Sequence, residues 1–180
     1  MEQKDYRLEM VKVLSKGEGH IRRIADVLGV NHMMVVRRLE ELKALNIVDF
    51  RMEGRNKVYF LRENGEARAY LLMMENYVLA NFLLKHSFLR EVIFKIQRDS
   101  RIKFACIFGS YAKDSEGRGS DVDIYLDVSD SKIAREYLKL DSKFSVKIGE
   151  WDSDNLLIKE IVGSHVLIKG AEVYYERVFG

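Results

Sequence analysis

Apolar residues recur three and four positions apart through the first part of the chain, in segments separated by glycines. This spacing is typical of one buried face of an α-helix. It predicts three helices, over residues 4–15, 20–28 and 31–45. Gly29 and Val30 form a tight turn before the third helix. Asn31 is a good cap for that helix, because its side-chain oxygen can accept a hydrogen bond from a free backbone N–H of the first turn.

The pattern then changes to short apolar runs that are typical of strands. Residues 47–52 and 57–61 predict the two strands of a hairpin, and residues 53–56 predict its turn. The hairpin carries three basic side chains, Arg51, Arg55 and Lys57. We interpret residues 1–62 as a first domain of three helices and a basic hairpin.

Residues 63–101 predict a helical connector. Asn64 and Gly65 interrupt the strand pattern, and helices are expected over 66–84 and 87–98. The first of these helices has a wider apolar face than a surface helix needs. It therefore either packs against both neighbouring domains or pairs with a second copy of the chain, and the second alternative predicts a homodimer.

A buried strand, a glycine turn and a second strand follow at residues 102–128. The run before Gly109 is almost continuously apolar, as in a strand buried on both faces. Gly109 lets the backbone turn, and Ser110 opens a short helix whose free N–H groups suit a phosphate. In the second strand Asp121 and Asp123 share one face, about 6.5–7 Å apart. Two such carboxylates can bind hard cations such as Mg²⁺.

The remaining chain alternates helices and strands. We expect a helix over 131–140, a strand over 144–148, a helix over 155–162, a strand over 165–168 and a final apolar-aromatic segment over 173–178. The chain as a whole is therefore predicted to have a mixed α+β fold, with a small mixed sheet in its C-terminal part.

Charge and composition indicate the cellular compartment and exclude some classes of site. Residues 1–62 hold 13 Lys and Arg against 9 Asp and Glu, whereas the other 118 residues hold 17 against 19. The single cysteine, Cys106, excludes a disulfide framework and a cysteine-cluster zinc site. No apolar stretch is long enough to span a bilayer, and no signal peptide opens the chain. We expect a cytoplasmic protein without a membrane partner.

The run NHMMVVRRLEELKALNIVDFRMEGRNKVYFL resembles the archaeal and bacterial winged helix-turn-helix regulators, over about the first 62 residues. The resemblance implies a double-stranded DNA partner, with the third helix in the major groove. On that helix the residues facing base edges would be His32, Met33, Val36 and Arg37. In the hairpin Arg51, Arg55 and Lys57 would meet phosphates or the minor groove. The alternative is that the domain mediates protein interaction or dimerisation.

The run GSYAKDSEGRGSDVDIYLDV resembles the minimal nucleotidyltransferases of the DNA polymerase beta superfamily, over about residues 86–180. By this resemblance Gly109 and Ser110 hold a nucleoside triphosphate, and Lys113 lies near its phosphates. Asp121 and Asp123 are the catalytic residues and bind Mg²⁺ or Mn²⁺. The implied reaction transfers a nucleoside monophosphate to a hydroxyl and releases pyrophosphate. The nucleotidyltransferase domain would span residues 102–180, with its first helix at about 86–99.

The sequence departs from this family at one position. The family carries a third carboxylate on a later strand, and in the segment VKIG the expected position holds Lys147. A cation there would repel a bound metal, since one interaction between unit charges is worth about 4 kcal/mol at 4 Å in a protein-like dielectric. Either Lys147 turns away and Glu150 substitutes through a bulge at Gly149, or the metal site is impaired.

Two hypotheses follow from these residues. The first is a Mg²⁺-dependent nucleotidyltransferase attached to a DNA-binding domain. The second is a homodimeric transcriptional regulator whose nucleotidyltransferase domain has lost turnover and binds a nucleotide or serves dimerisation.

Overall fold

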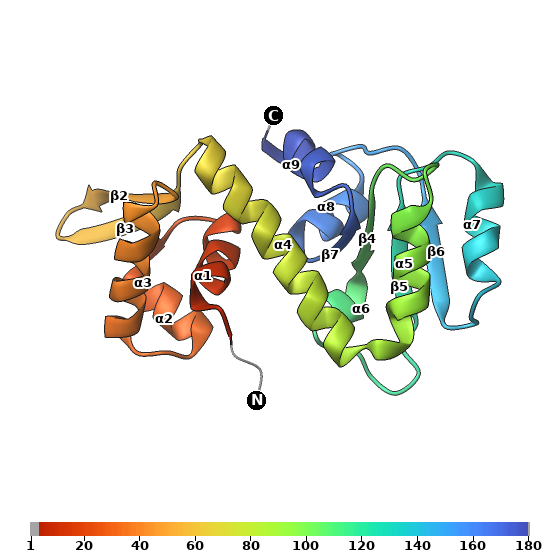
Figure 1. Cartoon of the computed structure of the whole chain (residues 1–180), viewed down its shortest axis with the longest axis horizontal. Helices are drawn as coiled ribbons and strands as arrows, with labels where there is room; N and C mark the ends of the chain where they lie inside the picture. The colour runs from red at the N-terminus through yellow and green to blue at the C-terminus, as the bar shows by residue number, and fades with distance from the viewer. Residues whose placement is uncertain (1–3, 180) are drawn as a thin grey trace. The chain divides into compact units, whose positions relative to one another are not determined.

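The computed structural model describes residues 4–179, which divide into two compact units between Tyr77 and Val78. The division falls inside α4 (Gly65–Lys85), so the expected connector over 63–101 is shared between the units. Helices and sheets occur together, as Figure 1 shows, which confirms the mixed α+β class. No helix within residues 4–179 is both long and apolar enough to cross a bilayer.

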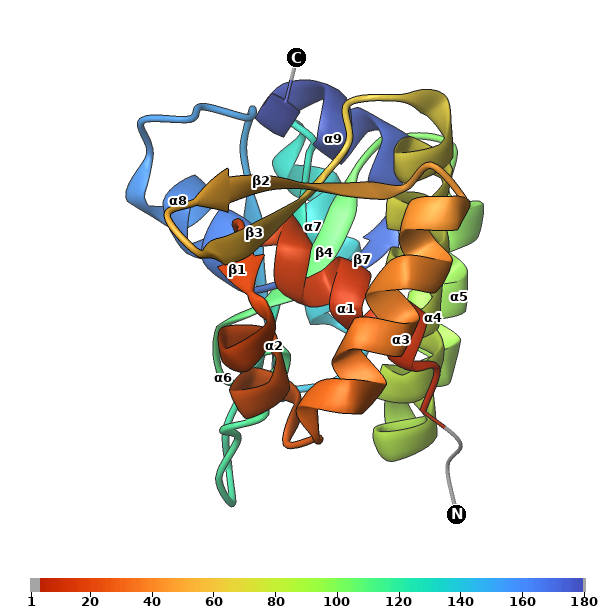
Figure 2. The same ribbon diagram turned by 90° about the vertical axis from the view of Figure 1, so that its left-hand side faces the viewer.

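The first unit is a winged helix-turn-helix (Figure 2). Its elements are α1 (Tyr6–Ser15), β1 (Gly19–His20), α2 (Ile21–Leu28), α3 (His32–Ala44), β2 (Val48–Glu53) and β3 (Asn56–Leu61), followed by α4. The strands form an antiparallel sheet in the order β1-β3-β2, with β2 and β3 as the hairpin. Three helices followed by such a hairpin are the arrangement that the sequence predicts.

Local signals set the ends of these helices. The Asp5 carboxylate accepts a hydrogen bond from the Arg7 backbone N–H at 2.9 Å and caps α1. Gly29 adopts a left-handed φ of 65° and ends α2, as glycine does without a steric penalty. The Asn31 side chain accepts from the Met34 N–H at 2.8 Å, which confirms the predicted cap of α3. Met10, Ile24 and other buried apolar side chains form the core of this unit.

The second unit is a four-stranded mixed sheet with helices on both faces (Figure 1). The sheet order is β6-β5-β4-β7, and only the β5–β6 pair is parallel. The strands are β4 (Ala105–Phe108), β5 (Val122–Leu126), β6 (Phe144–Ile148) and β7 (Val166–Lys169). The helices after α4 are a 3-10 turn (Ser87–Leu89), α5 (Arg90–Arg98), α6 (Gly109–Ala112), α7 (Ser131–Leu138), α8 (Leu156–Gly163) and α9 (Ala171–Phe179). The final segment, expected only as apolar and aromatic, is thus a helix.

Alternation along the strands divides the core of this unit between the two faces of the sheet. Ile107 and Ile124 pack in one cluster with buried residues of α5 and α7. The opposite face carries an aromatic cluster. The centre of the Phe104 ring lies 5.5 Å from that of Trp151 and 6.1 Å from that of Tyr174 in α9. The central strands are therefore buried on both sides, which confirms the prediction for the run before Gly109. Cys106 is buried in the middle of β4.

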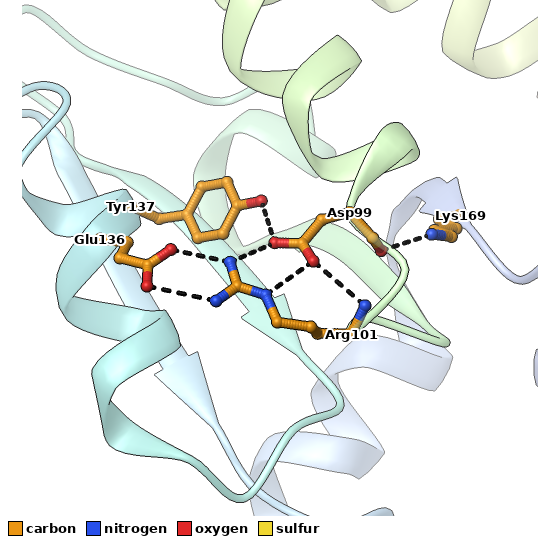
Figure 3. A network of polar contacts seen from close by, with 5 residues as sticks. All are labelled: Asp99, Arg101, Glu136, Tyr137 and Lys169. Atoms are coloured by element: carbon orange, nitrogen blue, oxygen red, sulfur yellow. Dashed lines mark hydrogen bonds and ion pairs between the residues drawn. The ribbon is translucent and has the colours of Figure 1, made fainter.

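A charged network ties the end of α5 to α7 and β7 (Figure 3). The Asp99 carboxylate accepts hydrogen bonds from the Arg101 guanidinium at 2.7 Å and from the Tyr137 hydroxyl at 3.0 Å. Arg101 also pairs with Glu136 at 2.7 Å, and the Lys169 ammonium donates to the Asp99 backbone carbonyl at 2.7 Å. The hydrogen bond from Arg101 holds the pKa of Asp99 far below its usual range, against the opposing effect of burial.

We expect Asp99→Asn to lower the free energy of unfolding by about 1–3 kcal/mol at neutral pH, because the side chain is only 10% exposed and its partners lose a charged acceptor. Tyr137→Phe removes one of these hydrogen bonds and should cost about 1 kcal/mol. The folded pKa of Asp99 is lowered, so its contribution is present above the unfolded pKa of about 3.9 and is lost as the pH falls below it. Denaturant unfolding at neutral and acidic pH measures both effects. An equal deficit at both pH values would contradict this assignment.

Candidate functional site

The turn after β4 brings Gly109 against Asp123. Gly109 has a φ of +70°, and a Cβ built on it would stand 2.6 Å from Asp123 Oδ2. Phe108 is the register partner of Asp123 across the antiparallel β4–β5 pair. Position 109 therefore requires glycine for two reasons, its backbone conformation and the nearby carboxylate. Ser110 follows in α6 and is partly exposed.

Asp121 and Asp123 lie where β5 begins. Asp121 directly precedes the strand and is exposed, and Asp123 is partly exposed on the face opposite the buried Val122 and Ile124. This alternation confirms the strand pattern that the sequence predicts. Both residues lie at the start of β5, and the Asp123 carboxylate faces the turn that holds Gly109. They are hard oxygen donors with access to solvent, which suits Mg²⁺ or Mn²⁺.

Lys113 lies at the C-terminal cap of α6, and its ammonium pairs with the Glu160 carboxylate of α8 at 2.6 Å. Both side chains are about half exposed. The sequence pattern placed Lys113 near phosphates but gave no sign of Glu160, which is distant in the chain. A phosphate that approaches Lys113 has to compete with this carboxylate.

The register of β6 changes the interpretation of the third carboxylate. In the parallel β5–β6 pair, Asp123 is opposite Ser145, and Lys147 is opposite Tyr125. Lys147 is exposed and makes no ion pair with Asp121 or Asp123 in the part of the chain that the structure describes. Ser145, and not Lys147, is thus the β6 residue beside Asp123. Among residues 4–179, no lysine or arginine side chain forms an ion pair with Asp121 or Asp123.

Glu150 does not compensate for the absent carboxylate through a bulge. It follows the C-terminal end of β6, and the carbonyl of Gly149 before it accepts a hydrogen bond from the Tyr125 hydroxyl at 2.8 Å. Asp123 lies at the opposite, N-terminal end of the parallel pair. Strand β6 itself, with the sequence FSVKI, contains no carboxylate.

The exposed side of α3 holds the residues that the sequence analysis assigned to base edges. His32 and Arg37 are exposed, Met33 is 76% exposed and Val36 is partly exposed. The buried residues of the helix lie on its other side, among them Val35. Arg37 pairs with Glu41 at 3.4 Å, an interaction that the sequence analysis did not anticipate.

The three basic residues of the hairpin differ in their surroundings. Arg51 pairs with Glu53 at 2.7 Å and with Glu18 at 2.5 Å. Arg55 is exposed at the turn, and the Lys57 ammonium lies 4.1 Å from the centre of the Phe50 ring. Arg51 is therefore largely compensated within the unit, whereas Arg55 makes no ion pair with any residue between 4 and 179.

A second polar cluster, which the sequence analysis did not predict, joins the end of α4 to the loop between α6 and β5. The Lys85 ammonium lies 2.9 Å from Asp114 Oδ1 and 2.8 Å from Glu116 Oε1. His86 Nε2 lies 3.7 Å from the same Glu116 oxygen. Burial lowers the pKa of the His86 imidazole, and the Glu116 carboxylate opposes this shift. No local pattern could reveal this cluster, because residues 85–86 and 114–116, which form it, are distant in sequence.

We expect Gly109→Ala to destabilise the second unit by about 1–3 kcal/mol, since alanine is strained at this φ and its methyl group would displace the Asp123 carboxylate. Gly117→Ala, in the loop that follows α6, is the matched control. Its Cβ would meet only Ser120 Oγ at 3.8 Å, an ordinary contact, so a change within about 0.5 kcal/mol is expected. Thermal unfolding compares the two variants, and equal losses would show that the close approach at Gly109 has no special cost.

Comparison with known proteins adds the family. No curated protein matches the chain. The chain is similar to the solved structure of a possible transcriptional regulatory protein from Mycobacterium bovis. The similar region covers 39% of this chain and 75% of the other chain, with 28% sequence identity and a TM-score of 0.36. The repressor BigR from Xylella fastidiosa covers 38% of this chain and 67% of its own, with 24% identity and a TM-score of 0.35. The topology of the first unit, three helices followed by a hairpin, is itself that of a winged helix-turn-helix. Residues 90–174 match the family model described as polymerase beta, nucleotidyltransferase. Residues 90–174 thus match a nucleotidyltransferase domain of the polymerase beta family, and the first unit has the topology of a winged helix-turn-helix.

Proposed function

We propose that this chain is a DNA-binding protein whose nucleotidyltransferase domain binds a nucleoside triphosphate with Mg²⁺ and transfers the nucleoside monophosphate to a hydroxyl. The observation that carries the proposal is the contact between the Gly109 turn and the Asp123 carboxylate. It brings a backbone turn suited to phosphates and a hard anionic ligand to one place. The β6 register, which puts Ser145 and not Lys147 opposite Asp123, supports metal binding there.

In the proposed reaction, Gly109 and Ser110 hold the triphosphate through backbone N–H groups and the serine hydroxyl. Asp121 and Asp123 hold the cation, which when bound neutralises charge on the phosphates. Lys113 leaves Glu160 and turns to the phosphates. The acceptor hydroxyl gives up its proton to water and forms a bond to the α-phosphorus. The bond from this phosphorus to the bridging oxygen breaks, and pyrophosphate leaves. Positioning and charge neutralisation are the main contributions that such a site makes.

A second candidate function follows from β6. Its residue beside Asp123 is Ser145, so no carboxylate of this strand can accept the proton of the attacking hydroxyl. The domain would then bind a nucleotide without turnover, and the chain would act as a nucleotide-sensing transcriptional regulator in the cytoplasm.

For the first unit, we propose that α3 enters the major groove of double-stranded DNA and that the hairpin contacts the backbone. The exposure of His32, Met33 and Arg37 on one side of α3 supports this role. A homodimer suits the proposal because helix-turn-helix proteins read two half-sites related by a two-fold axis.

Incubation with labelled nucleoside triphosphates, Mg²⁺ or Mn²⁺ and a cell lysate tests the enzymatic proposal. We expect label transfer by the intact chain and a loss of at least about a hundredfold in Asp121→Asn with Asp123→Asn, since the cation loses both charged ligands. Asp154→Asn is the control. The Asp154 side chain is 97% exposed, and the residue follows β6 in the sequence, whereas the aspartate pair precedes it. Nucleotide binding without transfer would favour the regulator, and transfer by the double variant would remove the assigned site.

DNA binding is tested by selection from a duplex library followed by titration at several salt concentrations. Arg37→Ala with Arg55→Ala should weaken binding, and loss of the Arg55 phosphate contact should lower the slope of log affinity against log salt by about 1. Arg90→Ala removes an exposed arginine of the second unit and should leave affinity and slope unchanged. Equal affinity of the double variant and the intact chain would reject the assigned surface.

A further inference from the structure

We propose that His86, Asp114 and Glu116 form a binding site for a divalent transition metal, best matched by Zn²⁺, that is separate from the aspartate pair of β5. One ligand atom from each of these residues lies within 4.8 Å of the others. The three side chains come from two segments of the second unit, the end of α4 and the loop between α6 and β5. They share no residue with the proposed nucleotide site.

The first observation is the place of the Lys85 ammonium. It lies 2.9 Å from Asp114 Oδ1 and 2.8 Å from Glu116 Oε1, so a cation already occupies the space between the two carboxylates. The cluster therefore holds its acidic groups in position in the metal-free chain. A divalent ion would replace the ammonium, because two cations cannot share these oxygens at such distances.

The second observation is independent of the acidic pair. His86 is only 6% exposed, yet its Nε2 is buried without a hydrogen-bond partner, and Glu116 Oε2 is buried in the same condition. Buried polar atoms are almost always hydrogen-bonded, so two unpartnered atoms in one cluster call for an explanation. A metal ion bound by the imidazole nitrogen and the carboxylate would satisfy both groups.

Packing holds the imidazole in this orientation. The ring lies 4.5 Å from the Phe82 ring and 5.2 Å from the Tyr111 ring, centre to centre. The nitrogen is thus presented to the cluster and cannot easily rotate into water. Pre-positioning of this kind lowers the entropic cost of binding a ligand.

The ligand set selects the ion. One imidazole nitrogen and two carboxylate oxygens match Zn²⁺, which binds such ligands at about 2.0–2.2 Å and can take a water as the fourth ligand. Mg²⁺ prefers oxygen ligands alone and fits the aspartate pair instead. The second unit would then have one site for a hard cation and one for a transition metal. The Zn²⁺ site would fix the loop that leads from Ser110 to Asp121.

Isothermal titration of the intact chain with Zn²⁺ in the presence of excess Mg²⁺ tests the proposal. We expect one tight site, with affinity reduced more than tenfold in His86→Phe, Asp114→Asn and Glu116→Gln. His86→Phe keeps an aromatic ring against Phe82 and Tyr111 and removes only the nitrogen ligand. Lys85→Met removes the competing ammonium and should raise the affinity. Asp121→Asn with Asp123→Asn should bind Zn²⁺ as the intact chain does.

Two further measurements separate metal binding from a general loss of structure. Thermal unfolding in a chelator checks that each variant is folded, and Zn²⁺ should raise the melting temperature of the intact chain but not of His86→Phe. Visible absorption of Co²⁺ in the same site reports the coordination geometry, and the spectrum should change in His86→Phe if the imidazole is a ligand. Unchanged Zn²⁺ affinity in His86→Phe, or loss of binding in the β5 double variant alone, would overturn the proposal. No Zn²⁺ binding by the intact chain and by Lys85→Met would do the same.

Discussion

The second unit depends on a close approach at the end of its central strand, where the Asp123 carboxylate occupies the space that a side chain at position 109 would need. The β4–β5 register enforces this approach, because Phe108 and Asp123 are direct partners. The register is in turn set by Ile107 and Ile124, which are buried in the core. A shift by one residue would turn these apolar side chains out of the core. Hydrophobic packing of the strands thus holds the Asp123 carboxylate close to the backbone at Gly109.

Electrostatic compensation distinguishes the basic residues of the first unit. Arg51 has two carboxylate partners and Arg37 has one, whereas Arg55 makes no ion pair with any of the residues from 4 to 179. The number of basic residues in the first part of the sequence is therefore larger than the number of basic side chains that have no carboxylate partner. Exposed ion pairs of this kind are weak, so phosphates can displace the carboxylates at little cost. The carboxylates still reduce attraction to nonspecific DNA at long range.

Much of the fold could be predicted because its signals are local. The cap at Asn31 and the alternation through β5 follow from residues close in sequence. The partner of Asp123 on β6 could not be predicted in this way, since the pairing crosses α7 and is fixed by packing of the whole sheet. The resemblance of the segment VKIG to the family pattern therefore pointed to Lys147, two positions beyond Ser145. The cluster around His86 has the same origin, because its acidic members come from a loop with no periodic pattern.

The burial of Cys106 inside β4 has a practical consequence. It is the only cysteine of the chain, and its buried thiol is not accessible to reagents in solution. The natural sequence is therefore a ready background for site-specific labelling. A single cysteine introduced on the hairpin or in the loop before β5 would carry a fluorophore or spin probe. The motions of either region could then be followed without altering the core.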